Sequence, residues 1–398
     1  MKIGLLGCGT VGSGVYEIIS NGKNKKFLKD LEVVKILVKD QSEVTMDIMT
    51  TNPADVLEND EIDLIVEVMG GINPAFKFIS KALSSGKHVV TANKAVVAKH
   101  LKDFNKLAEE NNAILLYEAS VGGGIPIIKS LKQAMRIDDV TKLDGILNGT
   151  TNFILYNMYE NNYEFDNILR LAQSKGYAEA DPSADIDGID IKNKINILSS
   201  IAYESIVPLE DIYSFGIRNI SKHDIDYFKK QNLTLKMLAN SVKEDGKYCA
   251  SVQPVLYTQS ELTGSVTSNF NIAGLAGETI GDLKFYGQGA GKFPTANAVV
   301  QDIIDVATGS HASYPSDFNK SIEFDGTLLT GKYYARIHSE DKDMVQKVEN
   351  IFKDVIEEEI HFREYYIINT KEIDQNQFKK LAEAALEVDE KFFMARYN

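Results

Sequence analysis

Residues 2–12 read KIGLLGCGTVG, an apolar segment that leads directly into a glycine-rich turn. Residues 2–6 predict a buried strand, residues 7–12 match G-x-G-x-x-G, and apolar residues at helical spacing follow. Glycines in this pattern allow a close approach of the backbone to a pyrophosphate, and the start of the helix supplies N–H donors. The pattern alone is weak evidence, but its position between a strand and a helix indicates a dinucleotide site. The predicted contacts are Gly7, Gly9, Thr10, Val11 and Gly12.

Further apolar segments alternate with helical patterns up to about residue 130. Strands are predicted at 31–38, 64–69, 87–91 and 113–117. This alternation predicts an α/β fold with a Rossmann-like, doubly wound parallel sheet. The second strand ends at Lys39 and Asp40, where such folds recognise the ribose: an acid accepts from a 2′-hydroxyl and a base attracts a 2′-phosphate. Because neighbouring strand residues point to opposite faces, only one should face the cofactor. We expect Lys39 and NADP, with NAD as the alternative.

The composition excludes several classes of protein. With 398 residues, 44% hydrophobic and 25% charged, the chain matches an ordinary globular protein of two or three domains. It has no apolar run long enough to span a membrane, and its glycine-broken start does not match a signal peptide. The net charge of −14 argues against nucleic acid or an anionic membrane as a partner. Two cysteines, Cys8 and Cys249, cannot form a disulfide framework, so we expect a cytoplasmic protein. The scattered histidines indicate no His-based metal cluster.

Residues 176–194, GYAEADPSADIDGIDIKNK, place five carboxylates ahead of Lys194. We expect a loop followed by a helix from Ile191, so that Asp190 and Lys194 share one helical face at i and i+4. Three interpretations are open: a surface ion pair, a calcium loop, or a pocket whose carboxylates hold a cationic substrate group beside a lysine acid. The calcium loop is the weakest, because its twelfth position is Asn196 where an EF-hand has glutamate.

Three other segments contain candidates for binding or catalysis. Lys94 follows the fourth predicted strand, at the edge where open α/β sheets place ligands. Residues 118–126, EASVGGGIP, combine a carboxylate with backbone carbonyls that could surround a hard cation. Residues 148–152, NGTTN, predict a helix capped by Thr150 or Thr151, whose N-terminus could hold a substrate carboxylate. Each segment also has an ordinary structural explanation: a lysine that caps a strand, a glycine turn at a domain junction, and a plain capped helix.

The remaining sequence predicts a second region and a small C-terminal module. Residues 284–292, KFYGQGAGK, predict a glycine-rich turn before a helix, and SYPSDF at 313–318 is typical of a linker. In the tail, strands are predicted at 333–337, 365–369 and 392–395, and helices at 343–352 and 375–386. We therefore expect an NAD(P)-binding domain at 1–130, a substrate-binding, catalytic and dimerisation domain at 131–315, and an α+β module at 316–398. The end of the second domain, at about 285–310, should return to the cofactor cleft.

Taken together, these motifs make the chain resemble the homoserine dehydrogenases over nearly its full length. The resemblance rests on GCGTVG, TANKA, YEASVGGGIP, GILNGTTNFIL, GYAEADPSADIDGIDIKNK and GQGAGKFPTANAVVQD. It implies reversible, NAD(P)H-dependent reduction of L-aspartate 4-semialdehyde to L-homoserine, on the route to threonine and methionine. It also implies a small-molecule substrate and a homodimer or homotetramer. Because the cofactor turn begins at Gly7, we expect the monofunctional form without a kinase-like extension.

The resemblance also implies roles for single residues. Lys194 matches the family's proton donor, and Lys94 matches the lysine at the nicotinamide and substrate. Hydride addition to an aldehyde builds negative charge on oxygen, which an ammonium group can stabilise and protonate. The other implied contacts are Glu179, Asp190 and Thr150 for the substrate, Gly176 and Gly291 for the cofactor, and Glu118 with the backbone oxygens of Val121, Gly123 and Ile125 for a sodium ion.

The tail is similar to the ACT-like regulatory module of many family members. Its first strand-to-helix turn reads Glu340-Asp341-Lys342 where such modules usually have a glycine. Without that glycine a backbone cannot approach an effector as closely, so we expect a dimerisation or vestigial role before threonine feedback.

Two alternatives compete with this function. A related semialdehyde or amino-acid dehydrogenase could use the same cofactor domain, although the acyl-phosphate-forming type needs a thiol nucleophile. Cys8 lies inside the phosphate turn and Cys249 has no base motif around it, which disfavours that type. A non-catalytic nucleotide sensor on the same fold predicts no turnover and no effect of removing Lys194.

Overall fold

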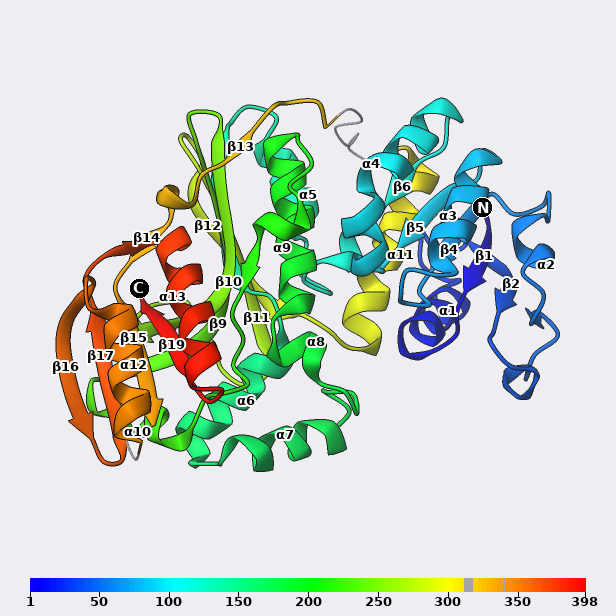
Figure 1. Ribbon diagram of the computed structural model, residues 1–398. Coiled ribbons are helices and arrows are strands. Elements are labelled where there is room, and N and C mark those ends of the chain that lie inside the picture. Colours follow the sequence, from blue (N-terminus) through cyan, green and yellow to red (C-terminus); the bar gives the residue numbers. More distant parts are fainter. Residues whose placement is uncertain (311–317, 339–340) are drawn as a thin grey trace. The chain divides into compact units, whose positions relative to one another are not determined.

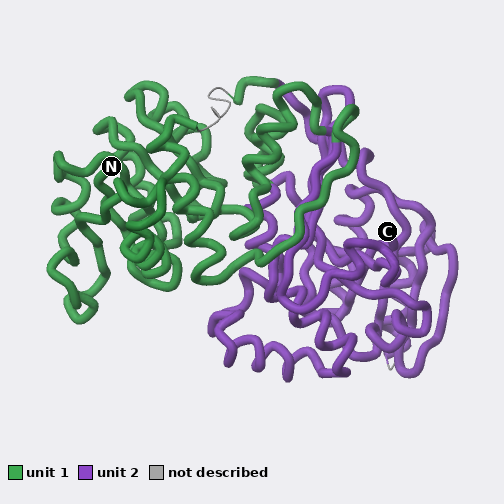
Figure 2. The backbone as a smooth tube through the Cα atoms, turned by 180° about the vertical axis from the view of Figure 1, so that it is seen from behind, with its two compact units in different colours: residues 1–140, 196–209, 277–320 green, residues 141–195, 210–276, 321–398 purple. Residues whose placement is uncertain are grey.

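The chain forms two compact units, and each unit is assembled from three separate segments (Figure 2). The computed structural model describes residues 1–310, 318–338 and 341–398. Unit 1 contains residues 1–140, 196–209 and 277–320, and unit 2 contains residues 141–195, 210–276 and 321–398. The division into three domains at residues 130 and 315 stays a prediction. Residues 313–317, which are most of the predicted linker, lie outside the described residues, and so does Glu340 of the predicted strand-to-helix turn in the tail.

The first sheet, in unit 1, confirms the predicted parallel architecture. Its strand order is β3-β2-β1-β4-β5-β6, and all of its neighbouring strands are parallel (Figure 1). The strands are β1 Lys2–Leu6, β2 Glu32–Leu37, β3 Met49–Thr50, β4 Leu64–Glu67, β5 His88–Thr91 and β6 Leu115–Leu116. The order reverses between β1 and β4, and this is where open α/β sheets form a ligand crevice at the carboxyl ends of the strands.

Helices cover the apolar strands of this sheet. They are α1 Thr10–Asn21, α2 Ala54–Leu57, α3 Ala75–Ser84, α4 Lys94–Glu110 and α11 Lys292–Thr308. Unit 1 also contains α5 Ile127–Ala134 and the short 3₁₀ turns η1 Gln41–Glu43 and η2 Glu118–Ser120. The core contains Ile3 and Leu5 from the sheet, Val15 from α1, and Val299 and Ile303 from α11. Helix α11, yellow in Figure 1, therefore packs beside the blue α1 although about 280 residues separate them.

A second, mainly antiparallel sheet forms the centre of unit 2, where its strand order is β11-β7-β9-β10-β19-β15-β17-β16. These strands are β7 Val140–Ile146, β9 Leu233–Glu244, β10 Lys247–Thr258, β11 Phe270–Gly277, β15 Tyr333–His338, β16 Ile356–Phe362, β17 Tyr365–Thr370 and β19 Phe393–Tyr397. Its helices are α6 Gly149–Asn161, α7 Phe165–Ser174, α8 Ser183–Ile186, α10 Lys222–Lys230, α12 Lys342–Phe352 and α13 Gln375–Val388, and α9 Ile189–Tyr203 begins there. Strand β19 pairs with β10, so the tail continues this sheet. Among the described residues no helix is both long and apolar enough to cross a membrane.

Two predicted features of the elements were wrong, and strand β16 was missed. Residues 284–288 belong to a strand, β12 Gly281–Gln288, so the glycine turn before α11 is shorter than predicted. Strand β16 was not predicted, because its sequence IEEEIHF carries three consecutive glutamates, which are unusual in strands. Helix α6 is capped by Asn148, whose side chain accepts a hydrogen bond from the Thr151 N–H, whereas Thr150 and Thr151 lie inside the helix.

Candidate active site

The glycine turn after β1 has the geometry of a phosphate-binding turn. Gly7 has φ +101°, a conformation that favours glycine, and a Cβ atom on Gly12 would overlap the carbonyl oxygen of Gly7. A Cβ atom on Gly9 would meet no atom within 4 Å, so the protein itself leaves this position open. Thr10 and Val11 form the first turn of α1, and no side chain caps that helix. The backbone N–H groups of the first turn are therefore oriented as donors for an anion.

The other predicted cofactor residues are spread over both units. Lys39 and Asp40 follow the end of β2, and both side chains are exposed. Gly291, with φ +128°, precedes α11 in unit 1. Gly176, with φ +73°, follows α7 in unit 2 and is exposed. Both glycines have conformations that L side chains rarely adopt.

Lys94 is the first residue of α4, directly after the carboxyl end of β5. The preceding residue, Asn93, caps this helix by accepting from the Val96 N–H, and its amide donates to the carbonyl oxygen of Gly71 at 2.6 Å. At the end of the neighbouring strand β4, the fully buried carboxyl group of Glu67 accepts from Thr91 Oγ1 at 2.6 Å. Burial raises the pKa of Glu67. This buried network fixes the backbone from which Lys94 projects.

Lys194 and Asp190 form a buried ion pair on the first turns of α9. The Lys194 Nζ atom donates to Asp190 Oδ2 at 2.6 Å and to the carbonyl oxygen of Leu147 at 2.6 Å. The two side chains are only 9% and 6% exposed, which contradicts the interpretation as a surface ion pair. Burying two charges is expensive and does not by itself stabilise a fold, so such a pair fits a functional role better than a structural one.

Two polar residues beside this pair were not predicted as site residues. The Asn148 Nδ2 atom donates to Asp190 Oδ2 at 2.9 Å and to Asp185 Oδ1 at 2.7 Å. The structure therefore brings Asp185, Asp190 and Lys194 together around one amide. Asn148 could have been noticed in the sequence, since asparagine is among the preferred helix N-caps and directly precedes Gly149. Asp185 was one of five carboxylates with nothing in the sequence to distinguish it.

The other predicted substrate residues lie in the same unit but make different contacts. The hydroxyl group of Thr150 donates to the carbonyl oxygen of Tyr177 at 2.7 Å. Glu179 has an exposed side chain, and its backbone oxygen accepts from Gln173 Nε2 at 3.0 Å. Thr150 therefore ties the start of α6 to the acidic segment, and the carboxylate of Glu179 faces solvent.

Residues 118–126, which were predicted to bind a cation, begin with Glu118, whose carboxyl group accepts hydrogen bonds from backbone N–H groups. The Glu118 side chain is buried and accepts from the N–H groups of Ile128 and Lys129 at the start of α5, at 2.9 and 2.8 Å. Burial and the nearby Asp302 raise its pKa to about 8. No group of three or more acidic, histidine or cysteine side chains suited to a metal ion occurs among the described residues. The carbonyl oxygen of Ile125, one of the predicted ligands, accepts from the Ile127 N–H at 2.8 Å. A sodium ion held by Glu118 and the backbone oxygens of Val121, Gly123 and Ile125 stays a prediction.

Comparisons with known proteins agree with these observations. Residues 7–118 match the model of the NAD-binding domain of homoserine dehydrogenase, and residues 126–304 match the homoserine dehydrogenase family model. The homoserine dehydrogenase of Bacillus subtilis is 35% identical over 370 residues, which cover 89% of this chain and 85% of that protein. The crystal structure of a homoserine dehydrogenase from Thiobacillus denitrificans superposes with a TM-score of 0.88 at 30% identity, covering 100% of this chain and 98% of that one.

The chain belongs to the homoserine dehydrogenase family.

Another family member, a hyperthermophilic archaeal homoserine dehydrogenase in complex with NADPH, superposes with a TM-score of 0.68 at 27% identity. It covers 78% of this chain and 98% of its own. Together with the match of residues 7–118, this family membership establishes a nicotinamide-nucleotide-binding domain in this chain.

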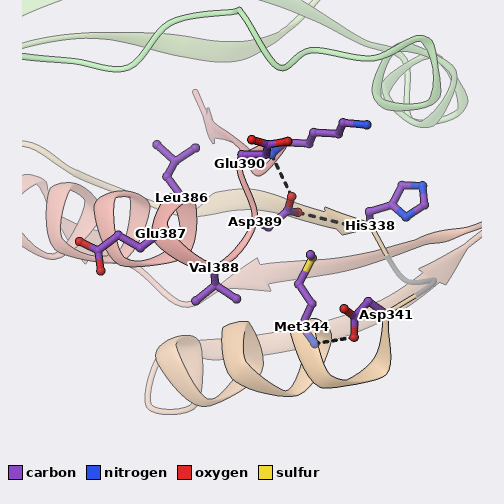
Figure 3. A pocket seen from close by; sticks show the side chains of 9 residues that line it. His338, Asp341, Met344, Leu386, Glu387, Val388, Asp389 and Glu390 are labelled. Atoms are coloured by element: carbon purple, nitrogen blue, oxygen red, sulfur yellow. Dashed lines mark hydrogen bonds between the residues drawn. The ribbon is translucent and has the colours of Figure 1, made fainter.

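A pocket also lies in the tail, between the end of β15, the start of α12 and the turn from α13 to β19 (Figure 3). Asp341 caps α12 by accepting from the N–H groups of Asp343 and Met344, and Asp389 accepts from the N–H of Lys391 at 2.9 Å. The lining residues are His338, Asp341, Met344, Leu386, Glu387, Val388, Asp389, Glu390 and Lys391. Its acidic side chains disfavour an anion there.

Proposed function

We propose that the protein catalyses the reversible reduction of L-aspartate 4-semialdehyde to L-homoserine with a reduced nicotinamide cofactor. The observation that carries the proposal is the buried Asp190–Lys194 pair, in which a lysine is held between a carboxylate and the Leu147 carbonyl. The carboxylate favours the charged form of the lysine, which is the form that can donate a proton. The acidic segment that contains this pair suits a substrate carrying an ammonium group.

The chemistry divides between groups for hydride and for proton transfer. A bound reduced nicotinamide supplies a hydride to the aldehyde carbon, and the carbonyl oxygen takes on negative charge. The Lys194 ammonium stabilises this charge and delivers the proton that completes the alcohol. In the reverse direction the neutral lysine accepts the hydroxyl proton of homoserine. Lys94 would contact the nicotinamide and the substrate. The amino-acid part of the substrate would be bound by Glu179, Asp190 and the start of α6 at Thr150.

For the cofactor we propose NADP in preference to NAD. The glycine turn at residues 7–12 would hold the pyrophosphate, with Gly176 and Gly291 as further contacts. Lys39 lies just beyond β2, is exposed, and can attract a 2′-phosphate. The archaeal relative in complex with NADPH supports this choice. A sodium ion at Glu118 and the backbone oxygens of Val121, Gly123 and Ile125, a homodimer or homotetramer, a cytoplasmic location and an ACT-like tail stay predictions.

The direct test is turnover by the purified protein with aspartate semialdehyde and NADPH, and with homoserine and NADP⁺ or NAD⁺. Homoserine should appear as the product, and the rates should be higher with the phosphorylated cofactor. Succinic semialdehyde, which lacks the ammonium group, serves as the matched control substrate and should react poorly. Nucleotide binding without turnover on any of these substrates would contradict the proposal and favour a nucleotide sensor.

A further inference from the structure

Asn148 occupies the corner between β7 and α6, where one side chain makes three hydrogen bonds of two kinds. Its oxygen accepts from the Thr151 N–H at 2.8 Å and caps α6. Its nitrogen donates to Asp185 on α8 and to Asp190 on α9. The side chain is buried, with 4% exposure, so water does not compete well for these bonds. The amide therefore connects the starts of three helices.

Two hydrogen-bond acceptors of Lys194, the proposed proton donor, are linked to residue 148. Asp190 Oδ2 accepts from both Asn148 Nδ2 and Lys194 Nζ, so the amide fixes the oxygen to which the lysine is bonded. The backbone neighbour Leu147 supplies the second acceptor for Lys194 Nζ. Two acceptors at fixed positions determine where the ammonium group lies, and both depend on the residue 147–148 corner.

The Asn148 amide also lies between two acidic side chains, Asp185 and Asp190. Asp185 and Asp190 approach the same nitrogen from different helices, and two neighbouring carboxylates tend to repel or to share a proton. A neutral amide can donate to both carboxyl groups without adding a positive charge that would compete with Lys194 for Asp190. A carboxylate or a hydroxyl at position 148 could keep the helix cap, but it could not link the two aspartates in this way.

We propose that Asn148 is a positioning residue for the reaction, which holds Asp190 and Lys194 in place for proton transfer. This inference rests on the proposed function. Asn148 acts through Asp190 and Lys194, whereas its helix-capping role is separate and can be supplied by other residues.

The test uses Asn148→Ser and Asn148→Asp in the full-length protein. Serine and aspartate are both good N-caps, so either residue can keep the start of α6. The melting temperature and the dissociation constant for NADP⁺ should change little in Asn148→Ser, whereas Asn148→Asp should lower the melting temperature because it adds a third carboxylate beside Asp185 and Asp190. The value of kcat for homoserine oxidation should fall at least tenfold in both variants. Asn157→Ser is the matched control: it is the same substitution in the same helix, at a side chain that bonds to the Phe153 carbonyl, and it should leave kcat unchanged.

A double-mutant cycle separates positioning from a merely structural role. In an Asp190→Asn background, Asn148→Ser should cost much less in kcat than in the wild type, because the residue through which Asn148 acts is already altered. Equal losses in both backgrounds, or an Asn148→Ser variant with wild-type kcat, would overturn the inference alone. An inactive wild-type protein would overturn the proposed function and this inference with it.

Discussion

At the scale of single residues, the proposed chemistry depends on a few side chains whose positions are fixed by buried hydrogen bonds. Lys194 is held by Asp190 and by the Leu147 carbonyl, and Asn148 ties Asp190 to Asp185. The glycines of the cofactor turn are equally constrained, but for different reasons. Gly12 is required by the protein itself, since a Cβ atom would overlap the Gly7 carbonyl, whereas Gly9 has open space around it.

This difference predicts that two glycine substitutions fail in different ways. Gly12→Ala should destabilise the fold by about 2 kcal/mol or more, because the overlap forces α1 away from β1. Gly9→Ala should leave stability within about 0.5 kcal/mol but weaken NADP⁺ binding, because the new methyl group occupies space that the pyrophosphate would need. Urea unfolding measures the first effect and nucleotide titration the second. Normal NADP⁺ affinity in Gly9→Ala would show that the phosphates bind elsewhere.

At the scale of elements, the sequence predicted the parts whose patterns are local. Five of the six strands of the first sheet follow from short apolar runs, whereas the two-residue strand β3 was not predicted. The i and i+4 placement of Asp190 and Lys194 follows from helical spacing alone. Burial of that pair and its contact with Asn148 could not be predicted, because residue 148 lies 42 positions away and nothing local sets the distance. The cap of α6 was missed for another reason: several adjacent residues in NGTTN are good N-caps, and propensity does not rank them.

A second cluster of charged residues comes from η2 and α5 and from α11, which is far from them in the sequence. Asp302 on α11 accepts from the Glu118 N–H at 2.9 Å and lies 3.4 Å from the Lys129 Nζ atom. Its carboxyl group is 1% exposed, and burial raises its pKa to about 6. Lys132 lies in the same surroundings, and burial lowers its pKa to about 6. These groups hold the segment that contains the predicted cation ligands.

Asp302 should make the stability of the protein depend on pH. The folded state binds the Asp302 proton more tightly than the unfolded state does, so this contribution is full below about pH 4 and is lost as the pH rises through about 6. Asp302→Asn keeps an acceptor for the Glu118 N–H but cannot titrate. The unfolding free energy of the variant, relative to the wild type, should therefore rise by about 1 kcal/mol between pH 5 and pH 7. Parallel pH profiles for the two proteins in urea unfolding would contradict this assignment.

At the scale of the whole molecule, the strands of the tail join the central sheet of unit 2. Strand β19 pairs with β10, so the tail shares the central sheet of unit 2. Asp224 on α10, fully buried, accepts from the Nε and Nη2 atoms of Arg336 on β15 at 3.1 and 3.2 Å, and from the Tyr334 hydroxyl at 2.6 Å. The sequence showed the alternation of strand and helix in the tail, but it could not show that these strands complete the sheet.

Replacing Arg336, the tail residue that pairs with the buried Asp224, should therefore destabilise unit 2. Arg336→Met leaves the Asp224 charge buried without its partner, and we expect a loss of about 3–5 kcal/mol in unfolding free energy. The control is Arg363→Met, which removes an exposed ion pair with Asp226 and should cost less than about 1 kcal/mol. Both values come from denaturant unfolding of the full-length protein. Similar small losses in the two variants would mean that the tail contributes little to the stability of unit 2.

The central claim is that Lys194 transfers the proton, and it is tested most directly with Lys194→Met. The measurement is kcat for homoserine-dependent reduction of NADP⁺, made beside NADP⁺ binding by the same preparation. We predict that binding survives within about twofold while kcat falls by about 10²-fold or more. Turnover near the wild-type rate in a variant that binds NADP⁺ normally would contradict the claim and assign proton transfer to another group.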